Sequence, residues 1–285
     1  MTMITRTAYR AVLGVLMAAV FALPSVSASA APRAELWERW TAHDAASTAT
    51  IDHSAWDRFL KANLVRRGDG INRLAYGRVT VADRKALARY LEALSMVPIS
   101  RYKRDEQLAY WINLYNALTV KVILDHYPVK SIRDIDISPG WFSFGPWDKK
   151  LFKVEDESLS LNDIEHRILR PIWRDARVHY AVNCASIGCP NVAPTAYNAE
   201  TMGGSLTEAA RAYINHPRGV LIEGGRLDVS KIYEWFVEDF GGDEKGILEH
   251  LSHYANSGLA KRLAKFAAID GYRYDWALND AVPTL

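Results

Sequence analysis

The two cysteines of the chain, Cys184 and Cys189, lie five positions apart in "VHYAVNCASIGCPNVAP" (residues 178–194), and each borders a turn rich in glycine and proline. Two thiols at this spacing allow three kinds of chemistry. One of them can act as a nucleophile, the two can form a disulfide, or both can bind a metal ion. Each alternative requires different partners elsewhere in the chain.

As a nucleophile, Cys184 must be a thiolate at working pH, and a nearby imidazolium or helix N-terminus can provide for that. We expect His166 to be its partner, with Glu165 or Asn183 orienting the imidazole ring. The turn after Cys184 can leave backbone N–H groups free for an oxyanion hole. Successive helix residues point about 100° apart, so Glu165 and His166 cannot both project straight into one site. One of the two is therefore expected to bind elsewhere or to act from the rim.

As a disulfide, Cys184 and Cys189 would close a six-residue ring through Gly188, which a tight turn allows. Neighbouring thiols are expected to pair in an oxidising compartment. So short a loop stabilises a fold by less than the roughly 3 kcal/mol expected for a fifteen-residue loop. The bond would therefore serve to fix the shape of the turn, and it would silence a catalytic Cys184.

As a metal site, the two cysteines would need His166 or His179 to complete a zinc ligand set. The C-x4-C spacing lies at the edge of structural zinc spacing, and the second pair of ligands is not an H-x3-H or C-x2-C cluster. We therefore predict no metal ion and no other cofactor.

Four further residues are candidates for substrate binding. Asn113 and Asn116 lie three positions apart and so share one helix face, where buried amides either pin a neighbouring loop or line a site. Most buried polar side chains bond to backbone, which favours loop pinning. Asn183 precedes the candidate nucleophile. Trp141 lies in the aromatic loop "ISPGWFSFGP", which could line a ligand cleft or cover the core.

Two segments must position the candidate catalytic residues. "SLSLNDIEHRILRPIW" (residues 158–173) predicts a helix that is capped near Ser160, stopped by Pro171 and carries Glu165 and His166. "ARVHYAVN" (residues 176–183) alternates apolar side chains with others as a strand does, and it would deliver Cys184 at its end.

The remaining segments predict a largely helical frame. Ser54 and Thr80, the latter with Asp83 three residues later, are expected to cap two amphipathic helices. Residues 104–127 are apolar on nearly every side and end before Pro128, which is typical of a buried central helix. Later segments predict a helix over residues 205–215, a hairpin around Gly224 and Gly225 and a helix after Ser230. We therefore predict an α+β fold, with a helix-rich N-terminal half packed on a small antiparallel sheet.

The N-terminus has the pattern of a secretory signal peptide. Arg6 and Arg10 precede an apolar run from Ala11 to Leu23, and small residues follow up to Ala30. The run is shorter than the roughly 20 residues that a membrane span needs. We expect cleavage after Ala30 and a periplasmic or secreted mature chain with no membrane span.

Removing the signal peptide leaves a chain without net charge. Its two arginines reduce the 35 basic residues to 33, which equals the 33 acidic residues. A chain of this balance lacks the basic surface that nucleic-acid binding requires. We divide the chain into the signal peptide (residues 1–30), an N-terminal helical segment (31–79) and a main globular domain (80–285).

Four motifs together resemble one known family. "YWINLYNALTV", "SLSLNDIEHRILR", "VHYAVNCASIGCP" and "YDWALN" resemble, in this order, the domain of unknown function 547, over roughly residues 80–280. The family occurs in exported bacterial proteins and in plant proteins, and no settled activity comes with its name. The resemblance matches its Glu-His pair to Glu165 and His166, and its Asn-Cys segment to Asn183 and Cys184, with Cys189 as the second cysteine.

A distant relation to papain-like or transglutaminase-like thiol enzymes is a further hypothesis. The chain departs from them, because it lacks their cysteine at a helix start followed by a downstream His and Asp or Asn. The function expected from these residues is a thiol-dependent hydrolase or acyl transferase acting on peptide-like or amide bonds in the envelope. The alternative is a non-catalytic envelope binding or scaffold module with a structural Cys184–Cys189 disulfide. In either case the ligand is an unidentified small molecule or peptide-like molecule.

Overall fold

The computed structural model describes residues 32–140 and 145–281. The expected signal peptide (residues 1–30) and the candidate substrate-binding residue Trp141 lie outside these ranges. The described residues belong to one compact unit. None of their helices is long and apolar enough to cross a membrane.

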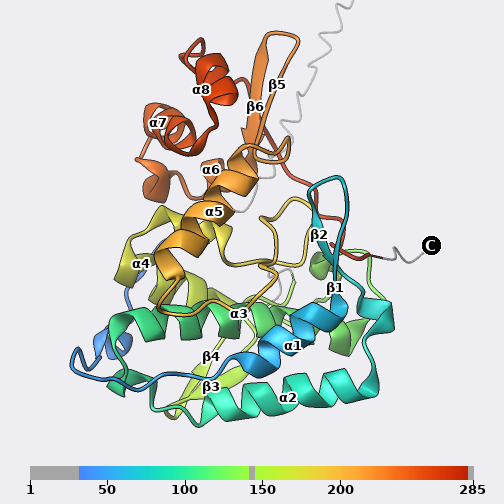
Figure 1. The fold of residues 1–285 in the computed structure, drawn as a ribbon, viewed down its shortest axis with the longest axis vertical. Helices are drawn as coiled ribbons and strands as arrows, with labels where there is room; N and C mark the ends of the chain where they lie inside the picture. The colour runs from blue at the N-terminus through green and yellow to red at the C-terminus, as the bar shows by residue number, and fades with distance from the viewer. Residues whose placement is uncertain (1–31, 141–144, 282–285) are drawn as a thin grey trace, which may run out of the picture. The chain divides into compact units, whose positions relative to one another are not determined.

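Helices make up most of the regular structure in this part of the chain (Figure 1). The α-helices are α1 (Ser54–Asn63), α2 (Val81–Ser95), α3 (Arg104–His126), α4 (Arg170–Trp173), α5 (Met202–Ile214), α6 (Lys231–Trp235), α7 (Glu244–Tyr254) and α8 (Ser257–Leu263). The strands are β1 (Leu64–Arg66), β2 (Asn72–Leu74), β3 (Phe152–Val154), β4 (Glu157–Leu159), β5 (Val220–Glu223), β6 (Arg226–Ser230) and β7 (Gly271–Arg273).

The strands form small sheets. β1 pairs with β2, β3 with β4 and β5 with β6, each pair antiparallel, and β7 then joins β6 in parallel. The hairpin predicted around Gly224 and Gly225 is confirmed, because both glycines have the positive φ angles, 56° and 80°, that a tight hairpin turn requires. The predicted α+β fold with small antiparallel sheets is confirmed, with β7 as a parallel addition.

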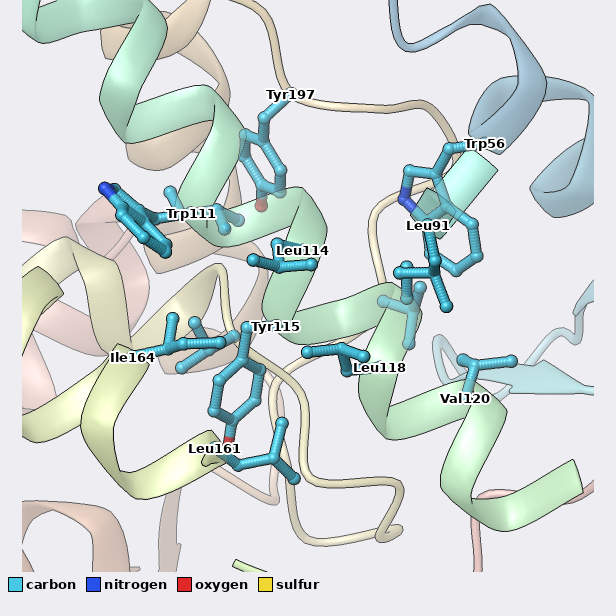
Figure 2. Close-up of a cluster of buried hydrophobic side chains, with 14 of the residues drawn as sticks. Trp56, Leu91, Trp111, Leu114, Tyr115, Leu118, Val120, Leu161, Ile164 and Tyr197 are labelled. Atoms are coloured by element: carbon cyan, nitrogen blue, oxygen red, sulfur yellow. The ribbon is translucent and has the colours of Figure 1, made fainter. Parts of the chain in front are cut away.

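The buried helix α3 is the axis of the larger core, as its apolar sequence predicts. Its first turn contains Asp105 and Glu106, which suit the positive end of the helix dipole. Figure 2 shows its side chains reaching toward several other elements. The residues that meet there come from α1 (Trp56), α2 (Leu91), α3 (Trp111, Leu114, Tyr115, Leu118, Val120) and the segments that carry Leu161, Ile164 and Tyr197.

The apolar side chains of the unit divide into two clusters. The first surrounds α3 and includes α1, α2 and buried residues of the segment around the two cysteines (residues 178–194), which we call the cysteine turn. The second lies among the hairpin β5–β6 and helices α5 to α8, at the other end of the view in Figure 1. Trp147 and Trp276 pack against the first cluster, and Trp235 and Tyr274 pack against the second. The candidate site lies where the two clusters meet.

Of the two caps predicted for the first two α-helices, one is confirmed. Thr80 and Asp83 form the expected reciprocal capping box before α2. The predicted cap at Ser54 is wrong, because Ser54 is the first residue of α1 and its own backbone N–H donates to Asp52 Oδ1 at 2.8 Å. The first backbone N–H of α1 is therefore satisfied by a side chain two residues earlier.

The helix that carries Glu165 and His166 continues through Pro171. Ser160 caps it as predicted, since its hydroxyl accepts from the Asp163 N–H at 3.1 Å. The predicted stop at Pro171 is wrong: a π-helical turn, Asp163–Leu169, leads directly into α4. The helix ends only at Arg174, whose φ is +49°. Single π-helical turns often occur at functional sites.

Pro171 and an N-terminal segment explain how this turn is satisfied. Because proline has no N–H, it cannot donate to the carbonyls of His166 or Arg167 inside the helix. These two carbonyls accept instead from the backbone N–H groups of Glu35 and Trp37, at 2.9 and 3.0 Å. The start of the described chain thus packs along the helix and supplies its missing donors.

The strand predicted over residues 176–183 is wrong. The chain forms a 3-10 helix, Ala176–Tyr180, in which the Asp175 side chain accepts from the Arg177 N–H. Every residue from Val178 to Asn183 is buried, so the alternation in the sequence does not separate a core face from a solvent face. Cys184 therefore follows a buried irregular segment.

The C-terminal tail ties the cysteine turn to the rest of the unit. Backbone N–H groups of Ile187 and Asn279 donate to Ala277 and Ala185, at 2.8 and 2.9 Å. Leu74 at the end of β2 donates in turn to Asn279 at 3.0 Å. Residues distant in sequence are thus brought beside the two thiols.

The role of α3 predicts a large cost for truncating its core side chains. Leu114 is fully buried, so Leu114→Ala is expected to lower the free energy of unfolding by about 2–5 kcal/mol in urea titrations. Met96→Ala, at a side chain that is 79% exposed, is the control and should change it by no more than about 0.5 kcal/mol. Equal midpoints for the two variants would contradict the central position of α3.

Candidate functional site

A side chain of α3 fixes the backbone of the cysteine turn. The Asn116 side chain donates to the Ala181 carbonyl at 2.8 Å and accepts from the Asn183 N–H at 2.9 Å. Asn183 then spans the turn itself, because its side chain donates to the Pro190 carbonyl at 2.6 Å and accepts from the Ala185 N–H at 2.8 Å. The two asparagines fix the backbone on both sides of Cys184.

Side chains from α5 and from the segment before β5 also bind the backbone of the turn. Arg218 donates to the carbonyls of Ile187 and Cys189, at 2.9 and 2.8 Å, and Tyr213 donates to that of Gly188 at 2.6 Å. Position 188 requires glycine, since a Cβ there would lie 2.7 Å from the backbone nitrogen of Asp275. The tail and the turn are therefore in backbone contact.

Cys184 and Cys189 are free thiols, so the predicted disulfide is not formed. Both sulfurs take part in hydrogen bonds instead. The Cys184 backbone N–H donates to Cys189 Sγ at 3.0 Å, and the Tyr274 hydroxyl donates to the same sulfur at 3.1 Å. Cys184 Sγ lies 3.1 Å from the Tyr274 oxygen and 3.3 Å from Ser186 Oγ. Cys184 is half-buried, whereas Cys189 is buried.

These contacts shift the pKa values of the two thiols in opposite directions. Burial raises the pKa of Cys189, but hydrogen bonds from Cys184, Tyr274 and the backbone outweigh it and lower the pKa from 9 to about 7. The pKa of Cys184 is raised, first by its hydrogen bond to Cys189 and then by burial. The pair therefore favours one thiolate, on Cys189, with the Cys184 thiol donating to it.

Four backbone N–H groups of this turn are not free to form the expected oxyanion hole, because each already has an acceptor. Those of Ala185, Ile187, Gly188 and Cys189 donate to Asn183, Ala277, Asp275 and Ser186, respectively. The hydroxyls of Ser186 and Tyr274, 2.8 Å apart, are the side-chain donors beside Cys184. Ala185 has a φ of +60°, a conformation that is costly for a residue other than glycine.

Glu165 and His166 belong to a second, buried cluster of charged side chains. His179 Nε2 lies 2.6 Å from Asp239 Oδ2, and its Nδ1 lies 3.7 Å from Glu165 Oε1. Arg170 Nε donates to the same Asp239 oxygen at 2.6 Å, and an Arg170 terminal nitrogen lies 3.1 Å from His166 Nδ1.

An aromatic ring covers this ion cluster. Phe236 stacks on the His179 imidazole, with the ring centroids 4.1 Å apart, and lies 4.8 Å from the Arg170 guanidinium. The cluster thus joins the π-helical turn to the residues just after α6.

The electrostatics of the ion cluster make His166 a poor base. Burial lowers the pKa of His166 from 6.5 to about 4, so its ring is neutral. Burial also acts against His179, but the hydrogen bonds to Asp239 and Glu165 raise its pKa overall. Despite burial, the pKa values of Glu165 and Asp239 fall to about 2. Two carboxylates therefore favour the charged form of the His179 imidazole and pair with the Arg170 guanidinium.

The structure separates the expected catalytic trio. Cys184 lies among the thiol contacts, whereas Glu165 and His166 pair with His179 and Arg170 in the ion cluster. In the described part of the chain no hydrogen bond joins Cys184 to His166. The buried Tyr115 hydroxyl is affected by both groups. Burial is the largest cause of its raised pKa, and the charges of Glu165 and of the two thiols raise it further.

The candidate substrate-binding asparagines have backbone partners. Asn113 donates to the Tyr197 carbonyl at 2.8 Å and accepts from the Tyr197 N–H at 3.0 Å. Asn116 and Asn183 hold the cysteine turn, as described above. The loop-pinning alternative therefore describes these side chains, and ligand binding by them stays a prediction.

Sequence reasoning missed several residues of the site. Tyr274 begins the "YDWALN" motif, so the sequence does mark it as a candidate. However, no local pattern predicts that a tyrosine near the C-terminus contacts the cysteine turn. Arg170 and Asp239 carry no motif that predicts their ion pair. Among the described residues, no group of three or more His, Cys, Asp or Glu side chains could hold a metal ion.

A family match covers much of this architecture. Residues 99–214 match a family model described as "Protein of unknown function, DUF547". Over this segment the chain is similar to the DUF547 family. No curated protein and no solved structure gives a significant match. The DUF547 segment contains α3, the π-helical turn and both cysteines, but it ends before Asp239 and Tyr274, which complete the two clusters.

The ion cluster predicts a large effect for one substitution. Asp239→Asn removes the carboxylate that pairs with His179 and with Arg170, whose side chain is only 3% exposed. Breaking a buried pair from one side is expected to lower the free energy of unfolding by about 3 kcal/mol. The pKa of His179 should fall as well, which an NMR titration of its ring would detect. Glu238→Gln, at an exposed neighbour, is the control and should change neither quantity.

The same cluster sets the pH dependence of stability. Because His166 is buried and neutral, stability should fall as the pH drops from about 6.5 toward 4, and fall further toward 2 as Glu165 and Asp239 become protonated. His179 acts in the opposite direction: its contribution is complete below pH 6.5 and is lost as the pH rises through its raised pKa. A flat stability profile between about pH 6.5 and 2 would contradict this assignment.

Proposed function

We propose that the protein is a thiol enzyme in which Cys184 is the nucleophile and the Cys189 thiolate is its base. The observation that carries the proposal is the hydrogen-bonded pair of free thiols, of which the buried one has a pKa of about 7. A general base acts most effectively when its pKa lies near the ambient pH, as that of Cys189 does. The half-buried Cys184 is the thiol that a substrate can reach.

The reaction that this pair supports best is thiol–disulfide exchange. The proton of Cys184 passes along the hydrogen bond to Cys189, and the resulting Cys184 thiolate attacks one sulfur of a substrate disulfide. A new Cys184–substrate disulfide forms, the substrate S–S bond breaks and the leaving thiolate takes the proton from Cys189. The Cys189 thiolate then attacks Cys184 and releases the second substrate thiolate. The protein pair is oxidised to a disulfide, and the substrate disulfide is reduced to two thiols.

Acyl transfer is a second candidate, favoured by the hydroxyls beside Cys184. Ser186 Oγ and the Tyr274 hydroxyl, 3.3 and 3.1 Å from Cys184 Sγ, could donate to an oxyanion that forms on an amide or peptide-like carbonyl. In this form the protein is a thiol-dependent hydrolase or acyl transferase, with the Cys189 thiolate in the position that histidine occupies in other thiol enzymes.

We place the reaction outside the cytoplasm. The basic start, apolar run and small residues of positions 1–30 support export and cleavage after Ala30. The balanced charge of the mature chain supports a partner other than nucleic acid. A small molecule or a peptide-like ligand fits this location.

The exchange reaction can be tested with reduced mature protein and hydroxyethyl disulfide. The rate should rise with pH and reach half its maximum near pH 7, as the Cys189 thiolate forms. Cys184→Ser should stop the reaction. Cys189→Ser should shift the pH profile upward and leave a trapped mixed disulfide that intact mass spectrometry detects.

Amide substrates separate the candidates. Acyl transfer predicts that Cys184→Ser abolishes turnover of a chromogenic amide with the fold intact, and that Cys189→Ser is the milder change. If both variants melt alike and the wild-type protein reacts with neither disulfide nor amide, both enzymatic proposals fail. The chain would then be a non-catalytic binding or scaffold module.

A further inference from the structure

Four aromatic rings form a connected group, and one of them, Tyr274, contacts both thiols. Tyr274 lies 4.8 Å from Trp235 and 4.7 Å from Trp276, measured between ring centroids. Trp276 lies 5.6 Å from Trp235 and 5.8 Å from Trp147. We call these four residues the aromatic wall.

The aromatic wall differs from the packed aromatic residues of the core. Core tryptophans such as Trp56 and Trp111 are 1–2% exposed, whereas all four side chains of the wall are half-buried. They come from the end of α6, from the segment after β7 and from the segment before β3, so they lie on connections that rigid elements hold. Binding residues concentrate at such positions.

The wall is continuous with the reactive thiols. Tyr274 is a member of the wall, and its hydroxyl contacts both sulfurs at 3.1 Å. A group that lies against the tryptophans would therefore bring an adjacent sulfur to Cys184. Holding the two reacting sulfurs in place in this way raises the rate of attack.

Arg133 adds a charge at the edge of the wall. Its guanidinium lies 5.3 Å from the centre of the Trp276 ring, and the residue is exposed. Within the described ranges no carboxylate forms an ion pair with it. The guanidinium can therefore donate to a carboxylate of a ligand that covers Trp276.

We infer that the aromatic wall and Arg133 bind a polypeptide segment that carries an apolar or aromatic side chain next to a disulfide-bonded cysteine and a carboxylate close by. This inference rests on the exchange reaction proposed for Cys184. The rings of Trp235, Tyr274 and Trp276 meet at angles of 57°, 54° and 35°, so they do not present one flat face. Such a surface fits an apolar side chain better than the flat face of a sugar ring.

The inference is tested by comparing two disulfides with the same reduced protein. One is hydroxyethyl disulfide, which has no apolar side chain. The other is the disulfide-linked dimer of a short peptide with phenylalanine on both sides of its cysteine and a C-terminal aspartate. Trp276→Ala should slow the peptide reaction roughly tenfold and change the small-disulfide rate less than about twofold, because only the peptide stacks on the wall. Arg133→Gln should slow only the peptide reaction, by a smaller factor.

Phe266→Ala is the matched control, because Phe266 is a half-buried aromatic residue of the second cluster outside the wall. It should leave both rates unchanged. Equal losses with both disulfides, or no loss in Trp276→Ala, would overturn the inference while leaving the exchange reaction standing. Quenching of tryptophan fluorescence by a soluble oligosaccharide and not by the peptide would also overturn it. A wild-type protein that reacts with neither disulfide would instead contradict the proposed function.

Discussion

Asn116 on α3 makes the two hydrogen bonds on which the geometry of the thiols depends. Its amide satisfies the Ala181 carbonyl and the Asn183 N–H, both of which are buried, and an unpaired buried group would cost about 1–3 kcal/mol. The irregular backbone before Cys184 can remain inside the protein only because these partners exist. Since α3 is itself buried on nearly all sides, the cysteine turn takes its rigidity from the most constrained helix of the fold.

Two groups of polar and charged side chains share this frame and differ in their electrostatics. The thiols meet Tyr274 and Ser186 at a half-buried position, where hydrogen bonds stabilise a thiolate on Cys189. In the ion cluster, Glu165 and Asp239 hold an imidazolium and a guanidinium and connect the π-helical turn to the segment after α6. The placement of charge thus stabilises paired ions in one group and, in the other, the thiolate on which the proposed reaction depends.

Local patterns in the sequence predict the features that depend on neighbouring residues. The Thr80 capping box, the apolar surface of α3 and the hairpin at Gly224 each follow from a few adjacent positions. The strand predicted over residues 176–183 fails because alternation cannot reveal that both faces are buried. The stop predicted at Pro171 fails because the helix carbonyls that a proline cannot satisfy have other donors. These are the backbone N–H groups of Glu35 and Trp37, which lie far away in sequence.

The candidate site shows the same division. Cysteine spacing and the motifs around Cys184 locate the turn, and the family match includes both cysteines. The partner of the thiols is Tyr274 and not His166, and only the path of the C-terminal tail brings it there. Sequence spacing contains no information about that contact.

The central claim is that the thiol pair holds one thiolate stabilised by Tyr274, and the ultraviolet absorbance of thiolates tests it most directly. In a pH titration of the reduced protein, one thiolate should appear near pH 7 and the second only well above pH 9. In Tyr274→Phe the first step should move toward the ordinary value of 9, because the sulfur of Cys189 loses a donor. Two thiols that titrate together near pH 9 in both proteins would contradict the account.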